Sequence, residues 1–154
     1  DVFDYDCTFD VHAVPGEVRN GTTPAPGQPG ASGRFRYGIN IAKNLICYNI
    51  ELYGVTGNYS SPALTATHIH EAARGASGPP RIAFPNPTGP DEKRVSVGCM
   101  QGPFRTGVLA PPMTGTDTGS ASGFQLAKIC QNPSGFFTDT HTSTFTLGAV
   151  RGQL

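Results

Sequence analysis

Apolar and polar residues alternate in short segments along this chain, and this alternation constrains its fold more than any other feature. It is clearest in two runs, residues 34–42 and 45–55, where every second residue is apolar. The apolar positions are Phe35, Tyr37, Ile39 and Ile41 in the first run and Ile46, Tyr48, Ile50 and Leu52 in the second. A period of two is typical of a β-strand with one buried face. Because only Lys43-Asn44 separates the runs, they predict a β-hairpin.

Further strands are predicted wherever short apolar or alternating segments stand between turn residues. They cover residues 2–14, 64–70, 81–84, 94–100, 136–142 and 145–153. The 20 Gly and 14 Pro favour many turns, and residues 15–33 and 103–122 are expected to be long, turn-rich loops. One short helix is predicted over residues 124–131, ending at Asn132-Pro133. This pattern indicates an all-β, antiparallel sandwich or barrel with one short helix.

Length and charge narrow the class of protein. A chain of 154 residues is expected to form a single domain, residues 1–154, that can bury its own core. Its 11 basic and 11 acidic residues give a net charge of zero, so nothing favours nucleic acid or an anionic membrane as a partner. No apolar run approaches the roughly 20 residues that a transmembrane helix needs.

Four features together predict a secreted protein. The chain starts at Asp1 rather than Met, as a processed mature protein would. Asn20-Gly21-Thr22 and Asn58-Tyr59-Ser60 are two sequons, so Asn20 and Asn58 are candidate glycosylation sites. The four cysteines are an even number, which suits two disulfides in an oxidising compartment. Of the three pairings that four cysteines allow, we favour Cys7–Cys47 and Cys99–Cys130, which join neighbours along the chain.

Three of the four histidines lie in places that suggest a metal site. His68 and His70 are two positions apart on a predicted strand, so both project from the same face while Ile69 turns to the other. His141 stands on another predicted strand with Asp139 at the same spacing, where a carboxylate could be a fourth ligand or orient an imidazole. His12 is left out, because it lies on the first predicted strand without a second histidine, and Asp10 is its only same-face acid. The alternative is a hydrogen-bonded polar cluster that ties two strands together.

Two motifs resemble those of the CHRD (chordin) domain family. The first is Ala66-Thr67-His68-Ile69-His70-Glu71-Ala72, followed by Gly75, Gly78 and Pro79. The second runs from Phe136 through His141-Thr142 to the closing Arg151-Gly152-Gln153-Leu154. The resemblance covers about residues 2–154. The chain is most similar to a single-domain, secreted, fungal-type member of the family.

This resemblance implies an immunoglobulin-like β-sandwich, a fold similar to that of Cu/Zn superoxide dismutase. By that similarity His68, His70 and His141 are candidate ligands of one copper ion, with zinc as the alternative, and a redox role is then expected. No histidine lies between His70 and His141, so the dismutase's bridging histidine and zinc loop have no counterpart. The alternative is a non-catalytic extracellular binding or structural module, whose partners would be extracellular proteins or cell-wall polysaccharides.

Overall fold

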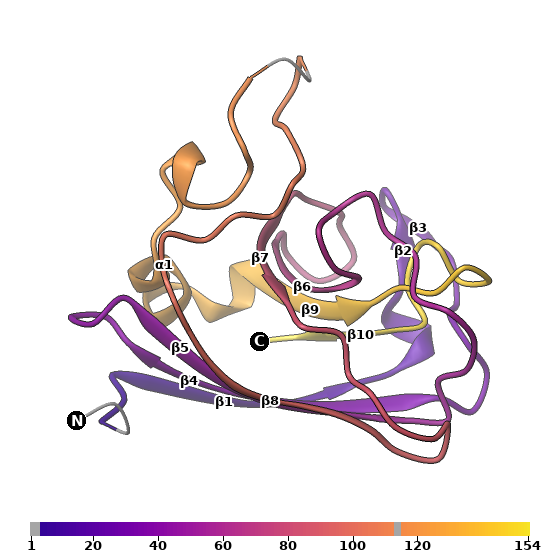
Figure 1. Cartoon of the computed structure of the whole chain (residues 1–154). Helices are drawn as coiled ribbons and strands as arrows, with labels where there is room; N and C mark the ends of the chain where they lie inside the picture. Colours follow the sequence, from indigo (N-terminus) through magenta and orange to yellow (C-terminus); the bar gives the residue numbers. More distant parts are fainter. Residues whose placement is uncertain (1–3, 113–114) are drawn as a thin grey trace.

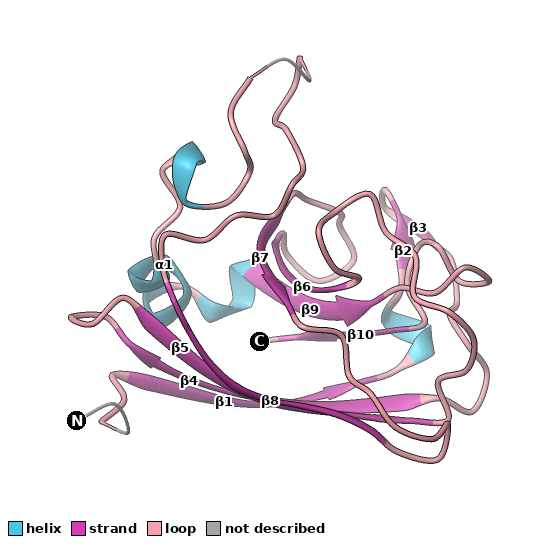
Figure 2. Ribbon diagram, in the orientation of Figure 1, coloured by secondary structure: helices cyan, strands magenta, loops and turns pink. Residues whose placement is uncertain are grey.

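Eight of the strands build two antiparallel sheets that pack face to face (Figures 1 and 2). The computed structural model describes residues 4–112 and 115–154. The first sheet has the order β1-β4-β5-β8. Its strands are β1 (Cys7–Ala13), β4 (Ser32–Asn40), β5 (Leu45–Tyr53) and β8 (Arg94–Gln101). The predicted hairpin is confirmed as β4 and β5, whose register places Tyr37 opposite Tyr48.

The second sheet has the order β10-β9-β6-β7 and carries the histidine motifs. Its strands are β6 (Thr67–Glu71), β7 (Pro80–Phe84), β9 (Phe136–Thr140) and β10 (Val150–Gln153). A small hairpin is formed by β2 (Arg19–Asn20) and β3 (Thr23–Pro24). The predicted helix is α1 (Leu126–Gln131), and single 3₁₀ turns occur at Pro15–Glu17, Ser120–Ser122 and Pro133–Gly135. No helix in the described residues is long and apolar enough to cross a bilayer.

The core lies between the sheets and is filled by the apolar half of each alternating strand. Phe35 and Ile39 project from β4, and Ile50 from β5, each with 0% of its surface exposed. The second sheet contributes Ile69 from β6 and Phe136 from β9. Because β-strand side chains alternate faces, the residues beside them in sequence must lie on the outer face of their sheet. The outer face of the second sheet is therefore where His68, His70 and Asp139 are found.

Several predicted strands were too long, the first and the last most of all. The strand predicted over 145–153 is present only at Val150–Gln153, because residues 142–148 turn back on themselves. The amide of Gly148 and the amide of Thr142 both donate to the carbonyl of Phe145, and Gly148 has a positive φ of 136°. The first strand begins at Cys7 rather than at residue 2; residues 2 and 3 lie outside the described part of the chain.

The predicted disulfide pairing was wrong, although all four cysteines are bonded. The disulfides are Cys7–Cys130 and Cys47–Cys99. Cys7 and Cys47 cannot meet, because β4 lies between their strands and they occupy opposite faces of the sheet. Their partners on β4 are the adjacent residues Ile39 and Gly38 respectively. Cys47 instead faces Cys99 directly across the β5–β8 ladder, while Cys7 joins the sheet edge to α1.

One edge of the sandwich is closed by backbone hydrogen bonds between the two sheets. Val14, just after β1, and Arg151 of β10 exchange amide–carbonyl bonds of 3.0 and 3.1 Å. Thr138 adds a link through the core, since the Tyr37 hydroxyl lies 2.7 Å from the Thr138 hydroxyl. These links fix β9 and β10, and therefore the outer face of the second sheet, relative to the first sheet.

Candidate metal centre

Neighbouring strands bring the two sequence motifs together. Strand β6 pairs antiparallel with β9, and the register places His68 opposite Asp139 and His70 opposite Phe137. Between the two histidines Ile69 faces the core with 0% exposure, as its position predicted. Thr138, beside Asp139 in sequence, likewise faces the core and donates to the His68 carbonyl. His68, His70 and Asp139 therefore share the outer face of the sheet.

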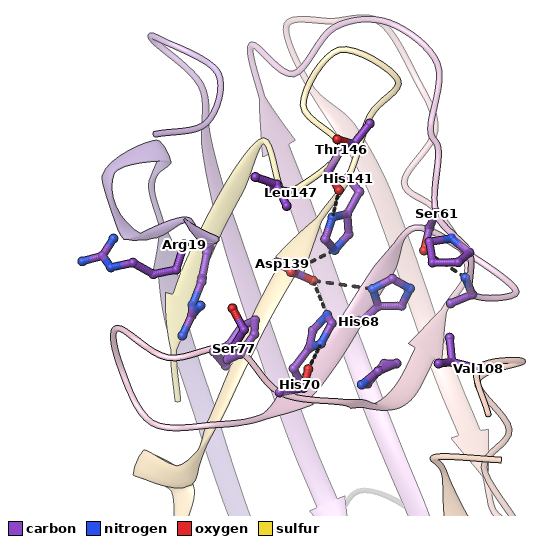
Figure 3. Close-up of a pocket in the computed structure, with 16 residues that line it drawn as sticks. Arg19, Ser61, His68, His70, Ser77, Val108, Asp139, His141, Thr146 and Leu147 are labelled. Carbon is purple, nitrogen blue, oxygen red and sulfur yellow. Dashed lines mark hydrogen bonds and ion pairs between the residues drawn. The ribbon is translucent and has the colours of Figure 1, made fainter. Parts of the chain in front are cut away.

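His141 joins this group just beyond the end of β9. Its amide donates to the Ala66 carbonyl at 2.9 Å, so the ladder between the two strands continues past Thr140. The same-face spacing predicted for Asp139 and His141 is therefore kept. One side-chain atom from each of His68, His70, Asp139 and His141 lies within 4.8 Å of all the others. Figure 3 shows the three imidazoles turned toward the central carboxylate.

Loops cover this part of the outer face. The side chains of His68 and Asp139 are only 2% and 4% exposed, and those of His70 and His141 are 12% exposed. A cavity of about 250 Å³ lies against the cluster. Its other walls come from six separate places in the chain: Arg19, residues 61–63, the turn with Ser77, Gly78 and Pro80, Val108, residues 146–147, and Arg151. The cluster therefore lies at the inner end of a partly enclosed pocket, not on an open sheet surface.

Backbone carbonyls fix which nitrogen of each imidazole points into the cluster. His68 Nε2 bonds the Thr65 carbonyl, His70 Nδ1 bonds the Gly78 carbonyl at 2.9 Å, and His141 Nδ1 bonds the Thr146 carbonyl at 3.0 Å. A carbonyl oxygen can only accept, so each of these ring nitrogens carries the proton. In neutral imidazoles the other nitrogens, His68 Nδ1, His70 Nε2 and His141 Nε2, are then bare acceptors. This is the arrangement that prepares histidine to bind a metal ion.

The fourth member of the cluster is also an acceptor. Asp139 Oδ1 lies 3.1 Å from His70 Nε2 and 3.6 Å from His68 Nδ1, and Oδ2 lies 2.9 Å from His141 Nε2. His68 Nδ1 and His141 Nε2 are buried without a hydrogen-bond partner among the described residues. Four acceptors without a donor repel one another in a buried site, so they need either protons or a cation between them.

Electrostatics limits how many protons the cluster can hold. Burial lowers the pKa of His68, and the nearby Asp139 carboxylate only partly offsets that effect. Burial also opposes charge on His141, but there the negative charge of Asp139, 2.9 Å from Nε2, has the stronger effect and raises its pKa. Burial would raise the pKa of Asp139, yet the charges of His141 and His70 hold it well below its usual range. Near neutral pH the site therefore has an ionised carboxylate and at least one neutral imidazole with a bare nitrogen.

Some of the residues around the cluster were not identified from the sequence. Phe137 stacks on His70 with ring centroids 4.6 Å apart and 4° between the planes. Arg151, which appeared in the sequence only as part of a family motif, lines the same cavity. The carbonyls of Thr65, Gly78 and Thr146 carry no sequence signal, because any residue has a carbonyl group. His12 lies exposed on β1 in the other sheet, apart from the cluster.

This donor set is chemically suited to a metal ion. Three imidazole nitrogens and one carboxylate oxygen suit Zn²⁺ and Cu²⁺, which both accept nitrogen and oxygen ligands. The candidate ligands span only a few ångströms, and each histidine is already oriented by a backbone carbonyl. A carboxylate among the ligands neutralises part of the ion's charge within a buried site. The cavity beside the cluster leaves space for a further ligand.

A comparison with protein-family models finds one match. The model of the CHRD domain matches residues 16–154, which is nearly the whole chain. The match includes both histidine motifs and the closing Arg-Gly-Gln-Leu segment. No curated protein and no solved structure matches the chain.

Proposed function

The chain belongs to the CHRD domain family, and we propose that its β-sandwich binds one divalent metal ion, copper in preference to zinc. The ligands are His68 Nδ1, His70 Nε2, His141 Nε2 and a carboxylate oxygen of Asp139. The observation that carries the proposal is the convergence of four acceptors within 4.8 Å of one another, two of the nitrogens having no hydrogen-bond partner among the described residues. A cation supplies what such a set lacks.

Copper is preferred to zinc because of general affinities. Sites of nitrogen and oxygen ligands bind Cu²⁺ more tightly than Zn²⁺, following the usual order of the first-row metals. Copper, when bound, supplies one-electron redox chemistry, which gives the site its redox role. The chain's own contribution is to orient the three imidazoles through backbone carbonyls, to keep Asp139 ionised, and to limit the access of water through the covering loops.

We also assign the protein to the extracellular space, as a secreted fungal-type glycoprotein. Two disulfides support an oxidising compartment, since they rarely persist in the cytosol. The two sequon asparagines, Asn20 and Asn58, are both exposed, so an oligosaccharide on either one would extend into solvent. Treatment with an endoglycosidase should reduce the mass of the native protein. An unchanged mass would contradict glycosylation at both positions.

Metal analysis tests the proposed site directly. The protein is loaded with copper or zinc, desalted and assayed for metal; we expect one equivalent in the wild type. His141→Ala should retain much less, because it removes one of three nitrogen ligands. His12→Ala is the matched control, since His12 is exposed on the other sheet. A wild type without stoichiometric metal, or a His141→Ala variant that retains as much, would contradict the proposal.

A second candidate function is a binding or structural module without catalysis. The favouring observation is that each histidine already bonds a backbone carbonyl, so the cluster connects β6 and β9 to the covering loops. In that case the cluster is a structural cross-link. Such a module would bind an extracellular protein or a cell-wall polysaccharide, and His68→Ala would leave that binding intact. Loss of a metal-dependent redox activity in His68→Ala favours the first candidate.

A further inference from the structure

Arg151 is a buried cation beside the proposed metal centre. It lies directly opposite Asp139 on β10, and its surface is only 3% exposed. Its guanidinium does not turn to that carboxylate. Instead the guanidinium carbon lies 3.5 Å from the centre of the Phe137 ring, and Nη2 donates to the Ala73 carbonyl at 3.2 Å. Arg151 therefore lines the cavity, and most of its side-chain N–H groups have no hydrogen-bond partner among the described residues.

The charge of Arg151 has no ion-pair partner in the part of the chain that the structure describes. Both oxygens of Asp139 are turned to the histidines. Arg19, which lines the same cavity, bonds only the carbonyls of Gly16 and Val18. A guanidinium has five N–H donors, and burying such a charge without an anion is costly. Two arginines without an anionic partner among the described residues thus line the cavity, and a bound anion would neutralise positive charge there.

The position of Arg151 relates it to the metal centre. Phe137 stacks on His70 on one side and on Arg151 on the other, because both groups could not occupy the same face of one ring. The guanidinium is therefore separated from a candidate ligand by the thickness of one aromatic ring. His70, Phe137 and Arg151 all line the same cavity of about 250 Å³. One small molecule in this cavity can contact both the guanidinium and the metal ligands.

The remaining walls favour an organic anion over an inorganic one. Pro62, Val108 and Leu147 present apolar surface to the cavity. A planar guanidinium matches the geometry of a carboxylate, which can accept two parallel hydrogen bonds from it. The volume is below the range of roughly 300–1,000 Å³ typical of sites for larger ligands. Together these features fit a carboxylate with a short carbon chain.

We propose that the cavity binds a small aliphatic carboxylate, with its acid group on Arg151 and its carbon chain against Pro62, Val108 and Leu147, beside the metal site. This inference rests on the proposed function for the metal ion, but the acid group depends only on Arg151. Arg19 adds positive charge to the same cavity without contacting the ligand's acid group. The protein therefore selects a ligand that has both a negative charge and a short apolar part.

Propionate and its neutral analogue propionamide test the charge requirement. The two molecules have nearly the same shape, and calorimetric titration into the copper-loaded wild type should show at least about tenfold tighter binding of propionate. Copper should also increase the relaxation rate of the bound propionate methyl protons, compared with the zinc-loaded protein. Equal binding of the amide and the acid would overturn the inference without any variant.

Variants test the role of Arg151 itself. Arg151→Gln should weaken propionate binding about tenfold or more, whereas Arg151→Lys, which keeps the charge but not the paired donors, should give an intermediate loss. The matched control is Arg74→Gln, which removes the same charge from an exposed side chain paired with Glu17. Its effect should stay below about twofold, because exposed charges are screened. Full propionate affinity in a folded Arg151→Gln would overturn the inference.

The two proposals can fail separately. If wild type retains one equivalent of metal but does not prefer propionate, the metal site stands and the carboxylate site does not. If wild type retains no metal, the proposed function fails, and propionate is then titrated into the metal-free protein. Binding that still depends on Arg151 would support the anion site alone, and its absence would overturn it.

Discussion

Asp139→Asn distinguishes a metal site from a structural polar cluster, because the two differ in what the carboxylate does in the metal-free protein. In a structural cluster, Asp139 is the partner of protonated histidines, and removing its charge is costly. In a metal site without its ion, the Asp139 carboxylate is one of four acceptors that lack a donor. An amide with two N–H donors can then replace the carboxylate with little loss of stability. The distances decide which neighbours the amide can reach: His141 Nε2 at 2.9 Å and His70 Nε2 at 3.1 Å.

The expected magnitude depends on pH, and the direction follows from the raised pKa of His141. An ion pair that raises a histidine pKa stabilises the fold fully below the unfolded value, and this contribution is lost as pH rises through the folded value. At about pH 6, Asp139→Asn should therefore cost about 3–5 kcal/mol, as breaking a buried ion pair does. At about pH 9, where His141 has lost its charge, the change should be within about 1 kcal/mol, since the amide donates to its bare nitrogen.

The assay is urea unfolding of chelator-treated protein at both pH values, followed by circular dichroism. Asp10→Asn is the matched control: Asp10 pairs with Arg34 on the outer face of the first sheet, and its side chain is 56% exposed. An exposed ion pair of this kind is screened by solvent, so its removal should change stability little at either pH. Copper at about 1,000 times its dissociation constant should then stabilise the wild type by about 4 kcal/mol, and Asp139→Asn much less.

Two results would refute this reasoning. A loss of several kcal/mol in metal-free Asp139→Asn at the higher pH would mean that the carboxylate still has protonated histidine partners there, as in a structural cluster. Equal stabilisation of wild type and Asp139→Asn by copper would mean that the ion binds elsewhere. Either result would favour the structural cluster over the metal site.

Three further outcomes are expected. Gly78→Ala should weaken metal binding several-fold in a metal titration, since a Cβ there would lie 2.0 Å from the Glu71 carbonyl oxygen and displace the turn that orients His70. Gly16→Ala is the control and should have no effect, because a Cβ there has nothing within 4 Å. Asp117→Asn should cost about 1 kcal/mol near pH 7 in urea unfolding. Its carboxylate resists protonation because backbone amides outweigh its burial and lower its pKa, so this difference should begin to shrink as pH falls below about 4 and disappear only at the lower pH where the folded carboxylate is protonated. Ile69→Ala should cost about 2–5 kcal/mol of stability, measured by the same unfolding assay, since Ile69 is 0% exposed.

Much of the candidate site could be predicted from local sequence because its geometry is local. A period of two places His68 and His70 on one face and Ile69 on the other, whatever the rest of the chain does. The same holds for Asp139 and His141. The two pairs form one cluster only if their strands are neighbours, which the local sequence does not determine. The sheet order provides this, because β6 pairs with β9.

The disulfides show where this locality ends. Whether two cysteines can bond depends on sheet order and on the face that each occupies, and neither is encoded near the cysteine. Cys47 and Cys99 are 52 positions apart, yet they face each other across one ladder. Cys7 and Cys47 are closer in sequence but are separated by a strand and by the thickness of the sheet.

By itself the sequence determined the sandwich class, the strands that build it and the face that each histidine occupies, because alternation is a property of a few neighbouring residues. Only the tertiary structure decided which ring nitrogens are bare, since the carbonyls of Gly78 and Thr146 come from loops that fold over the sheet. The same is true of Arg151, whose side chain was an ordinary charge in the sequence. Contacts between segments far apart in the chain turned it into a buried cation beside three histidines.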